Sequence, residues 1–192
     1  MSQARVLYDL QQIDTEIRTK KQRLGEVLRL QKEPPALVAA REAAQAAEDE
    51  LHRWRARHND LTLEIAGVTD KATRSEERLY SGVVKNPKEL NDLQHEVEAL
   101  GRRRATLEDE ALNVMMTVDE RRTVERAATA EVERLAGEFN AAVATLKVEQ
   151  QSLGVHLSKL IEKRGRQATL AQPAALKSYD QLIQEKRGLA VA

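Results

Sequence analysis

The sequence contains no cysteine and very few aromatic residues. Among its 192 residues there are one tryptophan, one phenylalanine and three tyrosines, so aromatic side chains make up 3% of the chain. Without cysteine, neither a disulfide nor a thiolate metal site can form within these residues. With so few large aromatic side chains, a thick globular core is not expected.

The sequence also lacks a net charge and a long apolar run. Its 31 basic and 31 acidic residues cancel, which excludes an overall electrostatic attraction to nucleic acid or to phospholipid. The first residues do not form the apolar core of a signal peptide, and no apolar run approaches the roughly 20 residues that span a bilayer. We therefore expect a cytoplasmic protein without membrane contact.

The residues that are present favour long helices. Hydrophobic residues make up 41% and charged residues 32% of the chain, and alanine, leucine, glutamate and arginine are frequent, a usage typical of coiled coils. Helix breakers occur in three places, at Pro34-Pro35, over 81–87 and from Gly165 to Pro173. The stretches between them are predicted to be helical.

Apolar residues recur every seven positions along both long stretches. From Leu37 to Leu79, eleven of thirteen a and d positions are apolar, and from Leu90 to Leu160 sixteen of twenty-one are apolar. A strict seven-residue repeat predicts a left-handed coiled coil. A shorter seam that begins at Val6 runs one residue out of phase with the seam after the prolines, so we expect the register to change there.

Two arms of nearly equal length favour an antiparallel hairpin. The predicted fold is therefore all-α, a long antiparallel coiled-coil hairpin kinked at Pro34-Pro35, with a short C-terminal helix that folds back against the open end. In this register Trp54 lies beside Val118. The expected division is a first arm at 3–79, a tip at 80–89 and a second arm at 90–164, which form a hairpin domain over 1–170, followed by a short helix and lead-in over 171–192.

We interpret the polar residues at the predicted seam as residues that specify the register of the coiled coil. They exclude alternative alignments of the two helices at a cost in stability. Glu149 is expected to pair with Lys20. The histidines, including His58 and His156 on the seam, lack the four-residue spacing of two metal ligands on one helical face. No nucleotide-binding loop, nucleophile motif or enclosed carboxylate pair is recognisable, so no catalytic residue is assigned and an enzyme is not expected.

The tip has the most informative local sequence. Asn86 is placed to cap the second arm, Pro87 fits the first helical position, and Glu89 can bond back to the cap. Exposed apolar and basic side chains at such an end can either contact a partner or simply be solvated, and both interpretations remain open. The candidate partner-binding residues are Tyr80, Val83, Val84, Lys85, Asn86, Pro87, Lys88 and Glu89.

A second candidate surface is a group of basic residues at the open end. Phosphate contact there would allow nucleic-acid binding, although acidic neighbours favour a solvated charged face. The candidate nucleic-acid-binding residues are Lys163, Arg164, Arg166, Lys20, Lys21 and Arg23.

The stretch from Arg78 to Leu100 resembles the tip of a bacterial family with a long N-terminal coiled-coil hairpin and a C-terminal four-cysteine zinc ribbon. The elements that carry the resemblance are Leu79-Tyr80-Ser81-Gly82, Asn86-Pro87-Lys88-Glu89-Leu90 and Leu93-Gln94-His95-Glu96. The layout of the whole chain is similar to that family, and the end from Tyr179 resembles its lead-in to the ribbon.

This resemblance implies a regulator of flagellar genes or type III secretion. Its expected partners are a sigma factor or secretion components, and RNA through the ribbon. The chain stops at Ala192, where the ribbon would begin, so it is either a truncated product or a member that has lost the ribbon, and we expect the first. Zinc is expected only in that missing ribbon, and no cofactor is assigned to this chain.

The prediction is a non-enzymatic adaptor or scaffold, monomeric or homodimeric, that binds protein partners through its tip. Two alternatives remain open. One is an RNA- or DNA-binding hairpin that uses the basic residues of the open end, and the other is a purely structural dimer.

Overall fold

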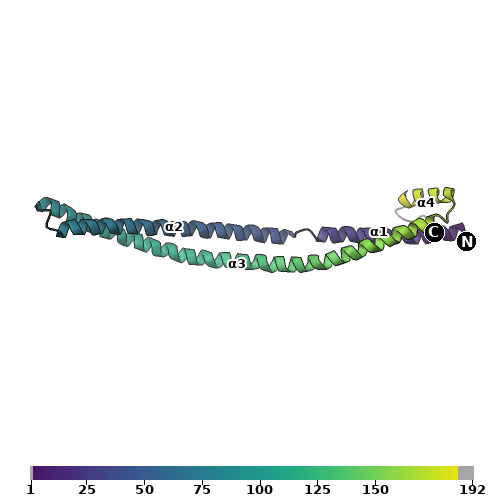
Figure 1. Ribbon diagram of the computed structural model, residues 1–192, viewed down its shortest axis with the longest axis horizontal. Coiled ribbons are helices and arrows are strands. Elements are labelled where there is room, and N and C mark those ends of the chain that lie inside the picture. The colour runs from purple at the N-terminus through teal and green to yellow at the C-terminus, as the bar shows by residue number, and fades with distance from the viewer. Residues whose placement is uncertain (1, 186–192) are drawn as a thin grey trace. The chain divides into compact units, whose positions relative to one another are not determined.

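Four helices contain almost all of the residues that the structure describes. The structure, a computed structural model, describes residues 2–185. No strand occurs in this range, so the all-α prediction is confirmed, and the lead-in predicted over 186–192 lies outside it. The helices, labelled in Figure 1, are α1 (Gln3–Leu30), α2 (Pro35–Tyr80), α3 (Pro87–Ala168) and α4 (Pro173–Glu185).

Prolines mark the starts of three helices. Pro35, Pro87 and Pro173 are the first residues of α2, α3 and α4, where a missing N–H removes no helical hydrogen bond and the fixed φ suits the helix. Residues 31–34 are not helical, so the predicted kink at the proline pair is confirmed. In contrast, Gly165 does not end α3, because a glycine weakens a helix interior without breaking its hydrogen-bond pattern.

The chain divides into two compact units, each of which pairs helical segments from distant parts of the sequence. Unit 2 comprises residues 35–135, in which α2 lies alongside the first part of α3 (Figure 1). Unit 1 comprises the described parts of 1–34 and 136–192, in which α1 and α4 lie against the last part of α3.

Ion pairs show that the helices of unit 2 are antiparallel. Arg57 of α2 pairs with Glu110 of α3, and Glu64, one heptad further along α2, accepts a 2.7 Å hydrogen bond from Arg103. Advancing seven residues along α2 thus means retreating seven residues along α3. The predicted hairpin direction is confirmed in this unit.

The core of unit 2 is a single stripe of aliphatic side chains. Its buried members are Leu51, Leu61, Leu107, Val114 and Val118, and the Trp54 ring packs against them. Val118 belongs to the cluster against which Trp54 packs, which agrees with the predicted proximity of the two residues. All these residues occupy predicted a or d positions, so the heptad pattern identified the core of this unit.

Unit 1 has its own stripe. Ile13 and Ile17 of α1 form a cluster with Leu157 and Leu160 of α3, and Leu24 packs against it. As residue numbers rise on α1 they fall on α3, which again indicates antiparallel packing. Of the α1 seam predicted from Val6 onward, Val6, Leu10, Ile13, Ile17 and Val27 are buried and Leu24 is half-buried.

The predicted register of α3 is wrong in unit 1. Ala142 and His156, both assigned to the seam, are exposed, whereas Val143 is half-buried and Leu157 is buried. From Phe139, the next inward residue is therefore four positions on, at Val143. Two successive spacings of four residues, from Leu135 to Phe139 and from Phe139 to Val143, correspond to a four-residue insertion in the heptad repeat, a stutter, which locally unwinds a coiled coil. Its physical reason is that α1 and α2 present seams of different phase, as the sequence already indicated.

The pairing predicted for Glu149 is also wrong. Its carboxylate accepts two hydrogen bonds from Arg23, Nε to Oε1 at 2.7 Å and Nη2 to Oε2 at 3.0 Å, while Lys20 lies 3.8 Å from Glu16. A planar guanidinium binds a carboxylate through both oxygens, which an ammonium group cannot do. This hydrogen bonding to Arg23 lowers the pKa of Glu149.

Helix α4 folds back within unit 1, as predicted. The Tyr179 ring is 2% exposed, and its hydroxyl donates a 2.9 Å hydrogen bond to Asp14 of α1. Arg164 of α3 donates to Asp14 at 2.6 Å and to Asp180 of α4 at 2.9 Å. This group of four side chains, the α4 clasp, links three helical segments of the unit.

Candidate partner-binding surface at the helical turn

The turn between α2 and α3 is held by its own short polar side chains. The Ser81 hydroxyl donates to the Arg78 carbonyl at 3.0 Å and accepts from the Val83 N–H at 3.3 Å. Gly82 has φ +70°, a left-handed conformation that glycine adopts without a steric penalty. The turn therefore has a defined local structure that does not depend on a partner.

The cap predicted for the second arm is present in a different form. Asn86 Oδ1 accepts a 3.0 Å hydrogen bond from the Lys88 N–H, so Asn86 is the predicted N-cap. Glu89 does not supply the reciprocal bond, because its carboxylate instead lies 3.4 Å from Arg78 Nη2. It joins the end of α2 to the start of α3 across the turn.

Replacing the cap tests this local structure. We expect Asn86→Ala to cost about 1 kcal/mol of helix stability, because alanine leaves the Lys88 N–H without its side-chain acceptor. The measurement is faster amide hydrogen exchange at the start of α3. Asn86→Asp retains the acceptor and is the control. Equal exchange in Asn86→Ala and the unchanged chain would contradict the assignment.

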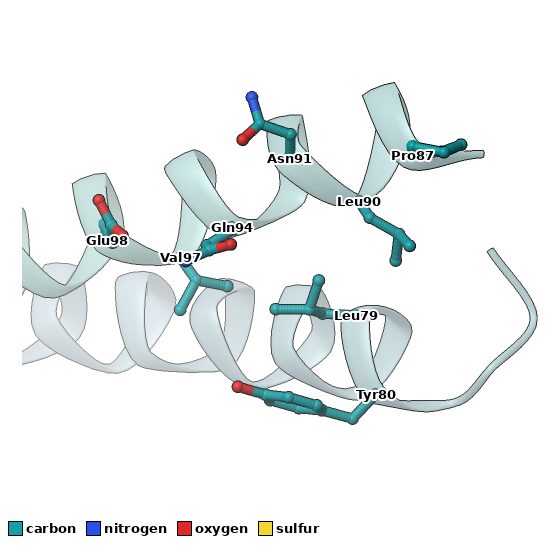
Figure 2. Close-up of a pocket in the computed structure, with 8 residues that line it drawn as sticks. All are labelled: Leu79, Tyr80, Pro87, Leu90, Asn91, Gln94, Val97 and Glu98. Carbon is teal, nitrogen blue, oxygen red and sulfur yellow. The ribbon is translucent and has the colours of Figure 1, made fainter. Parts of the chain in front are cut away.

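An open groove of ≈ 720 Å³ lies next to this turn. Figure 2 shows Leu79 pointing toward Leu90, with Val97 facing the same space between the two helices and the Tyr80 ring lying along α2. The groove forms because the seam ends at the turn, where no further layer of side chains covers the last apolar residues. Its lining residues are Leu79, Tyr80, Pro87, Leu90, Asn91, Gln94, Val97 and Glu98.

Two apolar side chains beside the groove are almost fully exposed. Tyr80 is 83% exposed and Val83 is 80% exposed. Single exposed apolar residues are common on any surface, but Tyr80 lines a groove whose other apolar residues are Leu79, Pro87, Leu90 and Val97, together with the polar Asn91, Gln94 and Glu98. Apolar side chains gathered at one groove indicate an interaction site more reliably than scattered ones do.

The structure places the eight predicted tip residues differently with respect to the groove. Tyr80 and Pro87 line it, Val84 is half-buried, and Val83, Lys85 and Lys88 are exposed beside it. Asn86 and Glu89 have structural contacts instead. Sequence reasoning missed the groove wall formed by Leu90 and its neighbours, since those residues were assigned to the seam. The stretch Leu93-Gln94-His95-Glu96, one of those that carry the family resemblance, contains Gln94 and was the sequence feature that could have indicated this wall.

At the open end, most of the predicted nucleic-acid-binding cations already have carboxylate partners. Arg164 is held by Asp14 and Asp180, and Arg166 donates a 2.9 Å hydrogen bond to Glu162. Arg23 and Lys20 pair with glutamates, as described above. Lys21 and Lys163 are exposed. Nucleic-acid binding by these six residues stays a prediction, and the contacts weigh against it because an engaged cation must break its pair to reach a phosphate.

The groove offers little acid–base chemistry. Glu98 is the single carboxylate among its lining residues, it is exposed, and it lies 4.0 Å from His95 and from Arg102. General acid–base catalysis requires a group held in place next to the reacting atoms, and the contacts of the Glu98 carboxylate are with the exposed side chains of His95 and Arg102. Within residues 2–185, no three potential metal ligands cluster.

Comparison with known proteins supports the fold. The family model described as the CT398-like coiled coil hairpin domain matches residues 9–187. The chain belongs to this family. The family description names a coiled-coil hairpin domain, which is consistent with a structural or scaffold role.

Two solved structures are similar to this CT398-like hairpin. The 2.12 Å structure of CT398 from Chlamydia trachomatis has a TM-score of 0.74 at 17% identity, over 96% of this chain and 78% of that one. HP0958 from Helicobacter pylori CCUG 17874 has a TM-score of 0.48 at 13% identity, over 95% of this chain and 73% of that one. At such identities the first likeness shows the fold alone.

No curated protein matches the chain in sequence. None of the described helices is long and apolar enough to cross a membrane.

Proposed function

We propose that this CT398-like hairpin is a non-enzymatic adaptor that binds a protein partner at the turn between α2 and α3. The observation that carries the proposal is the apolar groove at the turn together with the exposed Tyr80 ring beside it. Tyrosine is enriched among the residues that dominate interface energies, because one side chain supplies a large apolar area and a polar tip.

The local hydrogen bonds of the turn support the same role. Ser81 and Asn86 each hydrogen-bond to the backbone of the turn, and Arg78 contacts Glu89 across it. A preformed surface loses less conformational entropy on binding than a mobile loop does.

The resemblance identified in the sequence extends the proposal. On that basis, the partner is a sigma factor or a secretion component, and the hairpin acts as a spacer between the turn and a zinc ribbon beyond Ala192 that contacts nucleic acid. The protein then works in the cytoplasm as a regulator, either as a monomer or as a homodimer. The ribbon part is tested by reading the gene beyond codon 192 for two CxxC pairs.

The turn is tested by Tyr80→Ala. We expect about tenfold weaker recovery of the partner in a pull-down with the immobilised chain, because the substitution removes the largest exposed apolar side chain beside the groove. Tyr8→Ala is the matched control, since Tyr8 is also exposed but lies on α1 in the other unit. Helicity measured by circular dichroism should be unchanged in both variants. Equal recovery by Tyr80→Ala and Tyr8→Ala would remove the turn from the proposal.

A further inference from the structure

Ion pairs close one flank of the two-helix seam in unit 2 and leave the other open. On a helix surface, heptad position g lies beside d and position e lies beside a, so the antiparallel pair has a g flank and an e flank. Three pairs join α2 to α3 across the g flank: Arg57 with Glu110, Glu64 with Arg103, and Arg78 with Glu89. Across the e flank, residues 48–80 form no ion pair with residues 90–122, all of which the structure describes.

Two cavities of unit 2 open on the e flank. The first is the groove at the turn. The second has a volume of ≈ 320 Å³ and is lined by Arg55, His58, Asn59, Met115, Val118, Asp119 and Arg122. All the residues that line the two cavities occupy position a, b or e of the heptad repeat. Because position b lies next to e on the helix surface, the two cavities share this flank.

Small side chains line the e flank between the two cavities. The b and e positions there are Thr62, Ala66, Thr69 and Thr73 on α2, and Gly101, Ala105, Glu108 and Leu112 on α3. Glu108 is the one charged residue of this set, and it already pairs with Arg104 of its own helix at 3.2 Å. A Cβ added at Gly101 would meet no atom within 4 Å. The seam residues Ile65 and Val68 are half-buried, so large side chains of another helix can reach them from this flank.

A second copy of the chain does not fill this flank well. A twofold contact brings the same surface of both copies together, which would place two hollowed flanks face to face and leave voids that packed interfaces avoid. A contact with a different face of a second copy would be head-to-tail and would generate rings or filaments. A separate helix, whose large apolar side chains enter the cavities, has neither problem.

The lining residues give the two ends of the e flank opposite charge. Glu98 is the charged residue that lines the groove at the turn. In the second cavity, Asp119 accepts a 2.9 Å hydrogen bond from Arg122, so these two charges compensate and Arg55 leaves the cavity positive. A complementary helix therefore carries basic side chains near Glu98 and acidic side chains near Arg55.

We propose that a helix of the protein partner packs along the e flank as a third helix of the coiled coil, from the groove at the turn to the cavity at Arg55. Its apolar side chains lie against Leu90, Val97 and Val118. Gln94 and Val118 line opposite ends of this path, so the partner helix needs about 24 residues, a length of roughly 36 Å. This inference rests on the proposed function, since it extends the partner's site from the turn along unit 2.

Photo-crosslinking at three points along the flank tests this inference. The full chain carries p-benzoylphenylalanine in place of Gln94, Ala105 or Met115, one position at a time. It is expressed in the cells of origin and irradiated, and the crosslinked peptides are sequenced. The three products should map to one helix of one partner and advance along it by about 11 and about 10 residues, because both helices rise 1.5 Å per residue. Lysine or arginine should flank the product of position 94, and aspartate or glutamate that of position 115.

Two matched controls accompany this experiment. Met116 is 59% exposed beside Met115 but occupies position f, which faces away from the flank, so the same crosslinker there should give about tenfold less product. Gly101→Trp fills the flank and should lower the yield at position 115 about tenfold. Gly67→Trp adds the same side chain at position c of α2, where the space is also open, and should leave the yield unchanged. Circular dichroism checks that both variants keep their helicity.

The outcomes separate this inference from the proposed function. Partner products at position 94 without products at 105 and 115 overturn the third helix and leave the turn as the binding site. Products that join two copies of this chain, products in the opposite charge order, or a yield that survives Gly101→Trp overturn it as well. If no position gives a product and Tyr80→Ala is recovered with the partner as well as Tyr8→Ala, both proposals are overturned.

Discussion

Leu61→Ala is expected to destabilise unit 2 by about 2–4 kcal/mol. Leu61 is 0% exposed and lies in the cluster with Leu51, Leu107, Val114 and Val118. Removing its branched end loses the transfer free energy of the buried carbons and leaves a cavity. A two-helix pair has one such stripe and no second layer behind it, so the loss is large relative to the stability of the unit.

Trp54 provides the measurement for this unit. It is the one tryptophan of the chain and packs against the same cluster, so its fluorescence during urea unfolding reports on unit 2. Leu63→Ala is the matched control, because Leu63 lies two residues away on the same helix and is 72% exposed. Its expected effect is below about 0.5 kcal/mol. Similar shifts for Leu61→Ala and Leu63→Ala would mean that the seam has been assigned to the wrong face of α2.

The seam of unit 2 could be predicted from the sequence because its signal requires no knowledge of distant contacts. Hydrophobic burial depends on which residues are apolar, and a period of seven specifies one face of a supercoiled helix. Leu61 and Leu63 have identical side chains, but Leu61 is buried and Leu63 is exposed. Their heptad positions distinguish them. The proline-led helix starts are local for the same reason, since they depend on the φ of one residue.

The register of α3 in unit 1 could be predicted only in part in this way. Ala142 and Val143 are both apolar and fit either phase, whereas Leu157, next to His156, favours the observed one. The choice depends on α1, whose seam is out of phase with that of α2. A change of phase is visible in the sequence of α1, but the position on α3 that absorbs it depends on which residues face each other in the folded unit.

The candidate site was predictable in its exposed residues and not in its groove. Tyr80 and Lys88 stood out because no local structural role accounts for them. Leu79 and Leu90 fit the seam equally well, and they line a groove only because the seam ends beside them. Sequence periodicity assigns residues to a face, but it does not show where the covering layer stops.

Arg164→Ala is expected to destabilise the α4 clasp by about 2 kcal/mol. Asp14 has a side chain that is 14% exposed, and without Arg164 its carboxylate is left with the Tyr179 hydroxyl as its described side-chain partner. Hydrogen bonds to charged groups contribute about 1.5–3 kcal/mol, and the value is reduced here because the Arg164 side chain is 32% exposed. The measurement is amide hydrogen exchange over 173–185, which should become faster as α4 detaches.

This contact could not be predicted from the sequence, because nothing in the basic residues around Arg164 indicates that its partner is Asp14, 150 residues away.

Arg166→Ala supplies the matched control. Arg166 pairs with Glu162 through two exposed side chains, so its loss should change amide exchange over α4 very little.

Tyr179→Phe then tests the clasp from its other side by retaining the buried ring and removing the hydroxyl. Burial, and next the hydrogen bond to Asp14, raise the pKa of Tyr179 above its usual 10. The native state therefore keeps this proton at an alkaline pH at which the unfolded chain has lost it. It follows that the contribution of the hydroxyl is complete below about pH 10 and is lost as pH rises further. The stability difference between the unchanged chain and Tyr179→Phe should thus shrink above that pH. A difference that stays constant, or an equal response to Arg164→Ala and Arg166→Ala, would show that the clasp does not hold α4.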